Sequence, residues 1–114
     1  MKIQEIIEKL ELKILTQTIE TNNLETSNGY TSDLLSCVMA GAKPNCVWVT
    51  LQAHMNIIAV AALLEMSAII ISEDAQPEPA TIAKADQQSI LLLSTPRSSF
   101  EIVGKLWAMG LPAS

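Results

Sequence analysis

Three short runs of almost wholly apolar residues constrain this fold more than any other feature of the sequence. They are CVWVTL at 46–51, AIIIS at 68–72 and ILLLS at 90–94. Such runs are typical of strands whose two faces are both buried, as in a parallel sheet covered by helices. Segments with helical spacing separate them along the chain. We therefore predict one α/β domain over residues 1–114, with three α/β/α layers and a mostly parallel sheet of about four to five strands.

Other elements are predicted around these three runs. Ser98 and Glu101 form an S-x-x-E capping box that opens the last helix, and Gly110 ends it. Thr31 or Ser32 can cap an earlier helix, in which Asp33 would lie near the positive end. The predicted helices span about 2–10, 33–40, 55–65, 80–85 and 98–110, and further strands are predicted at 12–16 and 24–27.

The helix predicted from Met55 to Glu65 is apolar nearly all round, with only Asn56 and Glu65 polar. Such a helix cannot lie on a solvent face, so it is either sandwiched inside the fold or packed on another subunit. This surface is too large for one small domain to cover, which predicts a homodimer that uses this helix.

Composition excludes several classes of protein. The net charge is −5 and the seven Lys and Arg residues form no cluster, which argues against binding to nucleic acid or to anionic membrane surfaces. No apolar run reaches the roughly 20 residues of a membrane span, and the N-terminus lacks the plan of a signal peptide. We expect a cytoplasmic protein in which Cys37 and Cys46 are free thiols, with no metal site and no cofactor.

The only histidine, His54, lies between a predicted strand and a predicted helix, where α/β proteins often hold ligands. It could act as a general base, contact a ligand, or hydrogen-bond a turn or a partner subunit, and we favour the last role. Its neighbours Gln52 and Asn56 could bind the same ligand, or could satisfy free N–H groups in the first turn of the helix.

A second candidate site is the segment STPRSSFE at 94–101. It brings the hydroxyls of Ser94, Thr95 and Ser98 and the cation of Arg97 to the start of a helix, which suits a phosphate group. The simpler interpretation is a loop with a capping box. Glu73 and Asp74 could bind a divalent metal, but two adjacent acids are more often solvated. Because no catalytic motif is present, we predict that the protein is not an enzyme.

Several segments together resemble a DRTGG domain, most closely the small stand-alone members of that family. They are GYTSDLLS at 29–36, WVTLQAHMN at 48–56, and STP at 94–96 followed by Phe100, within a resemblance that covers about 29–111. The resemblance implies an α/β module related to the N-terminal domain of bacterial HPr kinase/phosphorylase. Such domains occur as an extra domain in some phosphotransacetylases and beside CBS domains in regulatable pyrophosphatases. The resemblance therefore implies a regulatory or association module that tends to dimerise.

The chain departs from this family at its name-giving signature. Where many members have Thr-Gly-Gly, this sequence has Ser72, Glu73 and Asp74, and two carboxylates would repel a phosphate that glycines could approach. The sequence therefore favours a non-enzymatic regulatory or association module, a homodimer that senses a small ligand. The alternative is a protein that binds a nucleotide or phosphometabolite through Gln52, His54, Asn56 and the 94–99 loop.

Overall fold

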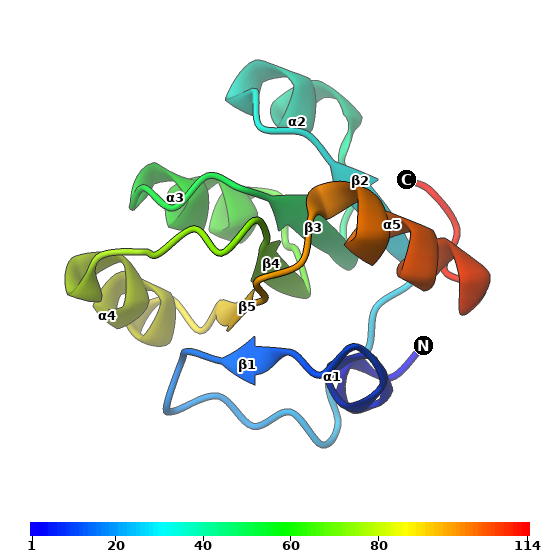
Figure 1. Ribbon diagram of the computed structural model, residues 1–114. Coiled ribbons are helices and arrows are strands. Elements are labelled where there is room, and N and C mark those ends of the chain that lie inside the picture. The colour runs from blue at the N-terminus through cyan, green and yellow to red at the C-terminus, as the bar shows by residue number, and fades with distance from the viewer.

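The three apolar runs form the centre of a parallel sheet, as predicted. The computed structural model describes residues 1–114 and contains five strands in the order β1-β5-β4-β3-β2 (Figure 1). Four strands are parallel to one another, and β1 (Lys13–Ile14) pairs antiparallel with β5 at one edge. The parallel strands are β2 (Asn28–Thr31), β3 (Cys46–Thr50), β4 (Ala68–Ile71) and β5 (Leu91–Ser94).

Helices cover both faces of this sheet, which confirms the three-layer α/β/α architecture. They are α1 (Ile3–Leu10), α2 (Leu35–Gly41), α3 (Asn56–Leu63), α4 (Pro79–Gln87) and α5 (Ser99–Ala108). One face carries α1 and α5, and the other carries α2, α3 and α4 (Figure 1). None of the five helices has the length and hydropathy of a membrane span.

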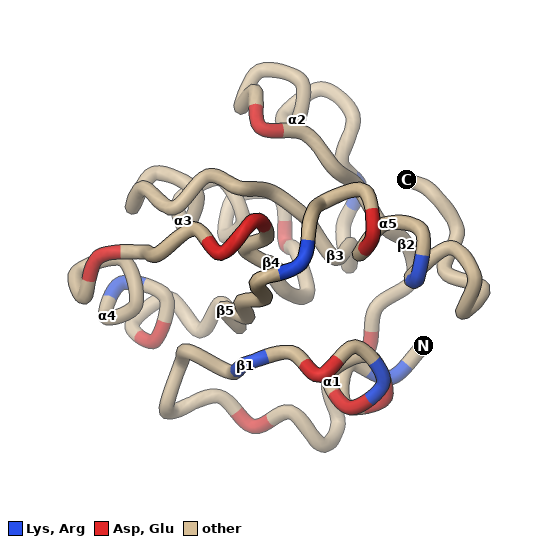
Figure 2. Tube along the Cα trace, viewed as in Figure 1, with Lys and Arg blue, Asp and Glu red and all other residues tan.

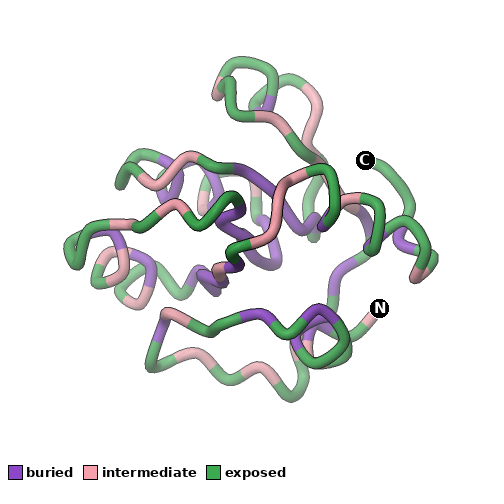
Figure 3. The backbone as a smooth tube through the Cα atoms, viewed as in Figure 1, coloured by how far each residue is buried: buried purple, intermediate pink, exposed green.

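Alternation along the central strands divides the core into two layers. In β3, Val47 and Val49 face the layer under α1 and α5, whereas Cys46 and Trp48 face the layer under α2, α3 and α4. The same period of two holds in β4 and β5, because successive side chains of a strand point to opposite faces. Figure 3 shows the buried residues concentrated in these strands and on the inward sides of the helices.

Helix α3 corrects one prediction. Its apolar surface does not require a partner subunit, because Ile57, Ile58 and Ala61 are fully buried within the domain and Val60 nearly so. These side chains pack on β3, β4 and the neighbouring helices in one core layer. A small domain covers this helix because three helices share that face of the sheet and shield one another. The exposed large apolar residue of α3 is Leu63, at its C-terminal end.

The element boundaries differ from prediction around β2 and α2. The strand predicted at 24–27 is wrong: β2 follows at Asn28–Thr31, where each residue pairs in register with β3. Helix α2 begins at Leu35, later than predicted, because the preceding residues make other bonds. Ser32 Oγ accepts a hydrogen bond from the Leu34 N–H, and the Asp33 carboxylate contacts the end of β3. Local helix signals at 31–33 are therefore overridden by contacts with the sheet.

The predicted beginning and end of α5 are confirmed. Ser98 Oγ accepts a hydrogen bond of 3.2 Å from the Glu101 N–H, as expected for an N-cap. At the other end Gly110 has φ +97°, a left-handed conformation that glycine adopts without strain and that lets the chain leave the helix.

We expect Ala61→Glu to abolish folding or to lower the free energy of unfolding by about 3–5 kcal/mol, because it would bury an unpaired carboxylate in the core. The matched control is Ala59→Glu, on the exposed side of the same helix, which should change stability by less than about 0.5 kcal/mol. Urea unfolding followed by circular dichroism measures both. Equal stability of the two variants would contradict the assigned burial of α3.

The segment after β1 is tied to α4 by a single carboxylate. Asp86 Oδ1 accepts hydrogen bonds from Gln17 N, Thr18 N and Thr18 Oγ1 at 2.8–3.0 Å. The hydrogen bond from the Thr18 N–H is the main cause that lowers the pKa of Asp86 below its ordinary value of 3.8.

This lowered pKa gives a pH prediction. The unfolded chain binds a proton at Asp86 more readily than the folded one, so the contribution to stability is complete above pH 3.8 and is lost as the pH falls through the folded pKa. Asp86→Asn should therefore weaken the acid dependence of the unfolding free energy below that pH. Urea titrations at several pH values would test this, and identical slopes for variant and wild type would contradict it.

Candidate functional site

The predicted site residues do lie at one edge of the sheet, where the parallel strands end. The loops after β3, β4 and β5 carry residues 51–56, 72–76 and 94–99, and all leave the sheet at this carboxyl edge. Strand β4 lies between β3 and β5 in the sheet. The turn that contains His54 is therefore separated from the 94–99 loop by the loop that follows β4.

An unpredicted residue, Asp33, organises the β3 end of this edge. Its Oδ1 accepts hydrogen bonds from Thr50 Oγ1 at 2.8 Å and from the Leu51 N–H at 2.9 Å. The Gln52 side chain donates to the Asp33 carbonyl oxygen at 3.0 Å. Gln52 is therefore used to join the β2–α2 loop to the β3–α3 turn, across two neighbouring strands.

His54 lies two residues before α3, at the seam where the sequence places it. Its Nδ1 accepts a hydrogen bond of 3.2 Å from the Asn56 N–H, and its carbonyl accepts one from the Ile57 N–H at 3.1 Å. Both donors are N–H groups at the start of α3, which have no acceptor within the helix. His54 therefore satisfies them, as a capping residue does. The imidazole and the Asn56 side chain are exposed to solvent.

The 94–99 loop leads into the N-terminus of α5. An acidic side chain from another loop already contacts the first N–H group of this helix. Glu73 Oε2 accepts a hydrogen bond of 2.8 Å from the Ser99 N–H, and Ser72 Oγ lies 2.5 Å from Ser99 Oγ. Thr95 is buried, and its Oγ1 accepts from the Arg97 N–H at 3.2 Å. The carboxylate of Glu73 thus interacts with the positive end of the helix, the place where a phosphate would bind.

Arg97, the cation of this loop, is bound to groups of the same chain. Its Nε lies 3.3 Å from a carboxylate oxygen of Glu101, its Nη2 lies 3.8 Å from Glu11, and its Nη1 donates to the Leu10 carbonyl at 3.0 Å. Elsewhere Lys and Arg are dispersed among acidic residues along the chain (Figure 2). The 94–99 loop therefore connects α1, β5 and α5 through Arg97.

The cysteines and acidic residues form no further candidate site. Burial raises the pKa of the Cys46 thiol to about 11, so this cysteine stays protonated inside the core, whereas Cys37 is exposed on α2. No group of three or more His, Cys, Asp or Glu side chains is placed to hold a metal ion. Glu73 and Asp74 have φ values of 60° and 58°, and this tight turn directs Glu73 to α5.

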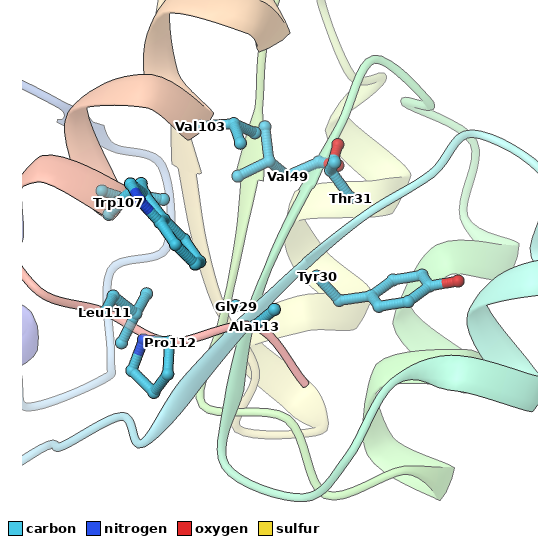
Figure 4. A pocket seen from close by; sticks show the side chains of 10 residues that line it. Gly29, Tyr30, Thr31, Val49, Val103, Trp107, Leu111, Pro112 and Ala113 are labelled. Carbon is cyan, nitrogen blue, oxygen red and sulfur yellow. The ribbon is translucent and has the colours of Figure 1, made fainter.

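A hollow of about 260 Å³ lies between α5 and the edge strand β2, away from the carboxyl-edge loops (Figure 4). Gly29, Thr31 and Val49 form its floor, and Val103 and Trp107 of α5 form one wall. Leu111, Pro112 and Ala113 close its other end, and Tyr30 borders it with a ring that points toward α2; Leu106 also lines it. No charged side chain lines this hollow.

The hollow depends on a glycine in the edge strand. A Cβ at Gly29 would stand 3.2 Å from Leu111, closer than ordinary packing allows. The C-terminal segment pairs beside this glycine, where the Gly29 N–H donates to the Pro112 carbonyl at 2.8 Å and the Ser114 N–H donates to the Gly29 carbonyl at 3.0 Å. The site residues predicted from the sequence did not include those that line the hollow. The sequence signal was Trp107, a large aromatic residue on the exposed side of α5.

Comparison with known proteins supports the fold. No protein-family model matches the chain, and no curated protein matches it. Among solved structures, it is similar to the CBS and DRTGG domains of the regulatory region of Clostridium perfringens pyrophosphatase, complexed with the activator diadenosine tetraphosphate. The TM-score is 0.75 at 17% sequence identity, over 97% of this chain and 47% of that chain. The two share their fold, and this chain spans about half the length of its neighbour.

For His54, we expect His54→Gln to lower the unfolding free energy by at most about 1 kcal/mol, since a glutamine carbonyl can still accept the hydrogen bond from the Asn56 N–H. His54→Ala removes the acceptor and should cost about 0.5–2 kcal/mol, the usual range for a lost cap. Urea unfolding of both variants tests this. A larger loss for the glutamine than for the alanine variant would contradict a capping role.

Proposed function

We propose that this protein is a regulatory association module of the DRTGG type. It performs no reaction itself, works as a homodimer and responds to a small ligand. The observation that carries this proposal is the apolar surface that α5 and β2 leave open to solvent. Phe100 and Trp107 are 91% and 67% exposed, and the hollow adjoins Trp107. Contiguous exposed apolar surface of this kind marks sites of association or ligand binding.

The state of the carboxyl edge supports a non-catalytic role. Nucleophilic catalysis by a hydroxyl or thiol commonly uses a base within hydrogen-bond reach of that group. His54 Nδ1 instead accepts from a backbone N–H, and the Ser98 hydroxyl caps α5. The structural neighbour supports a regulatory role, because the part of that pyrophosphatase that shares this fold belongs to its regulatory region.

The hollow is the preferred place for the ligand. Its walls carry no charge, and the indole of Trp107 offers a flat face, so it suits an uncharged planar ring such as a nucleobase. The alternative, a phosphate held at the 94–99 loop with Gln52, His54 and Asn56 nearby, is less favoured. Glu73 already contacts the α5 N-terminus, and Arg97 is paired with two carboxylates.

Oligomeric state and ligand response test the proposal together. Sedimentation velocity should give the mass of a dimer at tens of micromolar protein. In a thermal-shift panel of adenosine, AMP, ATP, diadenosine tetraphosphate and inorganic phosphate, a ligand present at 100 times its Kd should add about 2.7 kcal/mol of stability. Because Trp48 is fully buried, ring binding should change the fluorescence of Trp107.

The same panel separates the two ligand sites. Binding of adenosine that is lost in Trp107→Leu and kept in Arg97→Gln supports the hollow. Binding that requires phosphate and is lost in Arg97→Gln supports the 94–99 loop instead. A monomeric protein that responds to no compound, or a turnover of nucleotides that disappears in His54→Ala, would contradict the proposed function.

A further inference from the structure

An apolar stripe runs along the outward side of α5. It consists of Phe100, Gly104, Trp107 and Ala108, all exposed, at the spacing i, i+4, i+7 and i+8 that places residues on one side of a helix. The opposite side carries Ile102 and Leu106, which are buried in the core. Helix α5 is therefore apolar on two sides, and the domain itself covers only one of them.

Gly104, at the middle of the stripe, has no role in packing within the domain. A Cβ at this position would meet no atom within 4 Å. Glycine inside a helix is unfavourable relative to alanine because it increases the entropy lost on folding. What glycine permits is the close approach of another backbone. The stripe thus presents two exposed aromatic side chains on either side of a position where a second helix could lie close.

We propose that two copies of the chain associate by antiparallel packing of α5 on α5, around a twofold axis next to Gly104. This inference rests on the homodimer of the proposed function and locates its interface. Phe100 precedes Gly104 by four residues and Trp107 follows it by three. A twofold axis at this point places Phe100 of each copy against Trp107 of the partner subunit, and the two glycines at the crossing point. Such an isologous contact forms twice, once in each direction.

The charged residues beside the stripe are arranged to favour the same geometry. Glu101 and Lys105 lie on one flank of α5, with Lys105 Nζ 3.9 Å from a Glu101 carboxylate oxygen. In an antiparallel pair, this flank faces the same flank of the partner, so Glu101 of each copy lies near Lys105 of the partner subunit. In a parallel pair the same flank of the two copies would lie on opposite sides of the interface, so Glu101 and Lys105 would not meet their partners. Complementary flanking charges determine the orientation of paired helices in this way.

This charge pattern is the reason to assign a second copy as the occupant of the stripe. In the antiparallel arrangement the surface is complementary to itself in charge. On the opposite face, Leu63 of α3 is 67% exposed and has Asn56 and Ala59 as its exposed helical neighbours, and Met39 of α2 is 51% exposed. Leu63 therefore offers no comparable stripe. Since Trp107 also lines the hollow, the interface borders the proposed ligand site.

The first test measures the dimer dissociation constant by sedimentation velocity. Phe100→Ser and Gly104→Gln should each raise it by at least about tenfold, as for residues at the centre of an interface. Gly104→Gln should also raise the melting temperature at protein concentrations where the chain is monomeric, because it replaces glycine by a better helix former. The matched control Leu63→Ser, at a residue as exposed as Trp107, should leave the constant unchanged.

The second test mixes two charge variants. Glu101→Lys makes the flank wholly basic and Lys105→Glu makes it wholly acidic, so each variant alone should dimerise more weakly than wild type. Mixed together, they should form a heterodimer in preference to either homodimer, detected by native mass spectrometry. This readout separates contacts between subunits from the Glu101–Lys105 contact within one helix.

The outcomes distinguish the interface from the proposed function. A wild-type dimer that Leu63→Ser dissociates, while Phe100→Ser and Gly104→Gln do not, overturns the α5 interface and leaves the homodimer in place. Random pairing of the two charge variants overturns the antiparallel arrangement. A wild-type chain that is monomeric at tens of micromolar overturns both the homodimer and this interface.

Discussion

The burial of both faces of β3, β4 and β5 is the constraint on which the rest of the structure depends. Alternate side chains of each strand enter two separate core layers, so helices must cover both sides of the sheet. Because α3 covers one side of the sheet, its apolar surface is buried inside the domain. On the other face, α1 and α5 cover the sheet but leave the flank beside β2 open, and there the exposed aromatic residues and the hollow occur.

Parallel pairing also gathers the loops at one edge of the sheet. Polar groups at this edge already form hydrogen bonds within the chain. Asp33 joins the β2 and β3 ends, His54 caps α3, and Glu73 contacts the first turn of α5. A helix N-terminus attracts anions, and a carboxylate supplied by the chain itself meets that preference. Ser72 and Glu73 therefore have a structural role at this edge, whereas exposed apolar surface lies along α5.

The chain shares its fold with the CBS and DRTGG domains of the regulatory region of a pyrophosphatase. At 17% identity the common property is the framework of strands and helices. Functions are carried by particular sites on a framework. We propose that, for this chain, those sites are the α5 stripe and the adjoining hollow.

The fold class, the central strands and the N-cap of α5 at Ser98 could be predicted from the sequence, because each depends on local periodicity or on residues a few positions apart. The sequence also placed His54 at the end of β3. It failed to predict β2, whose existence depends on pairing with β3, and the contacts of Asp33, Glu73 and Arg97, which join segments distant in the chain. Tertiary structure alone decided that α3 is buried and that α5 has an uncovered side, because exposure depends on which helices share each face of the sheet.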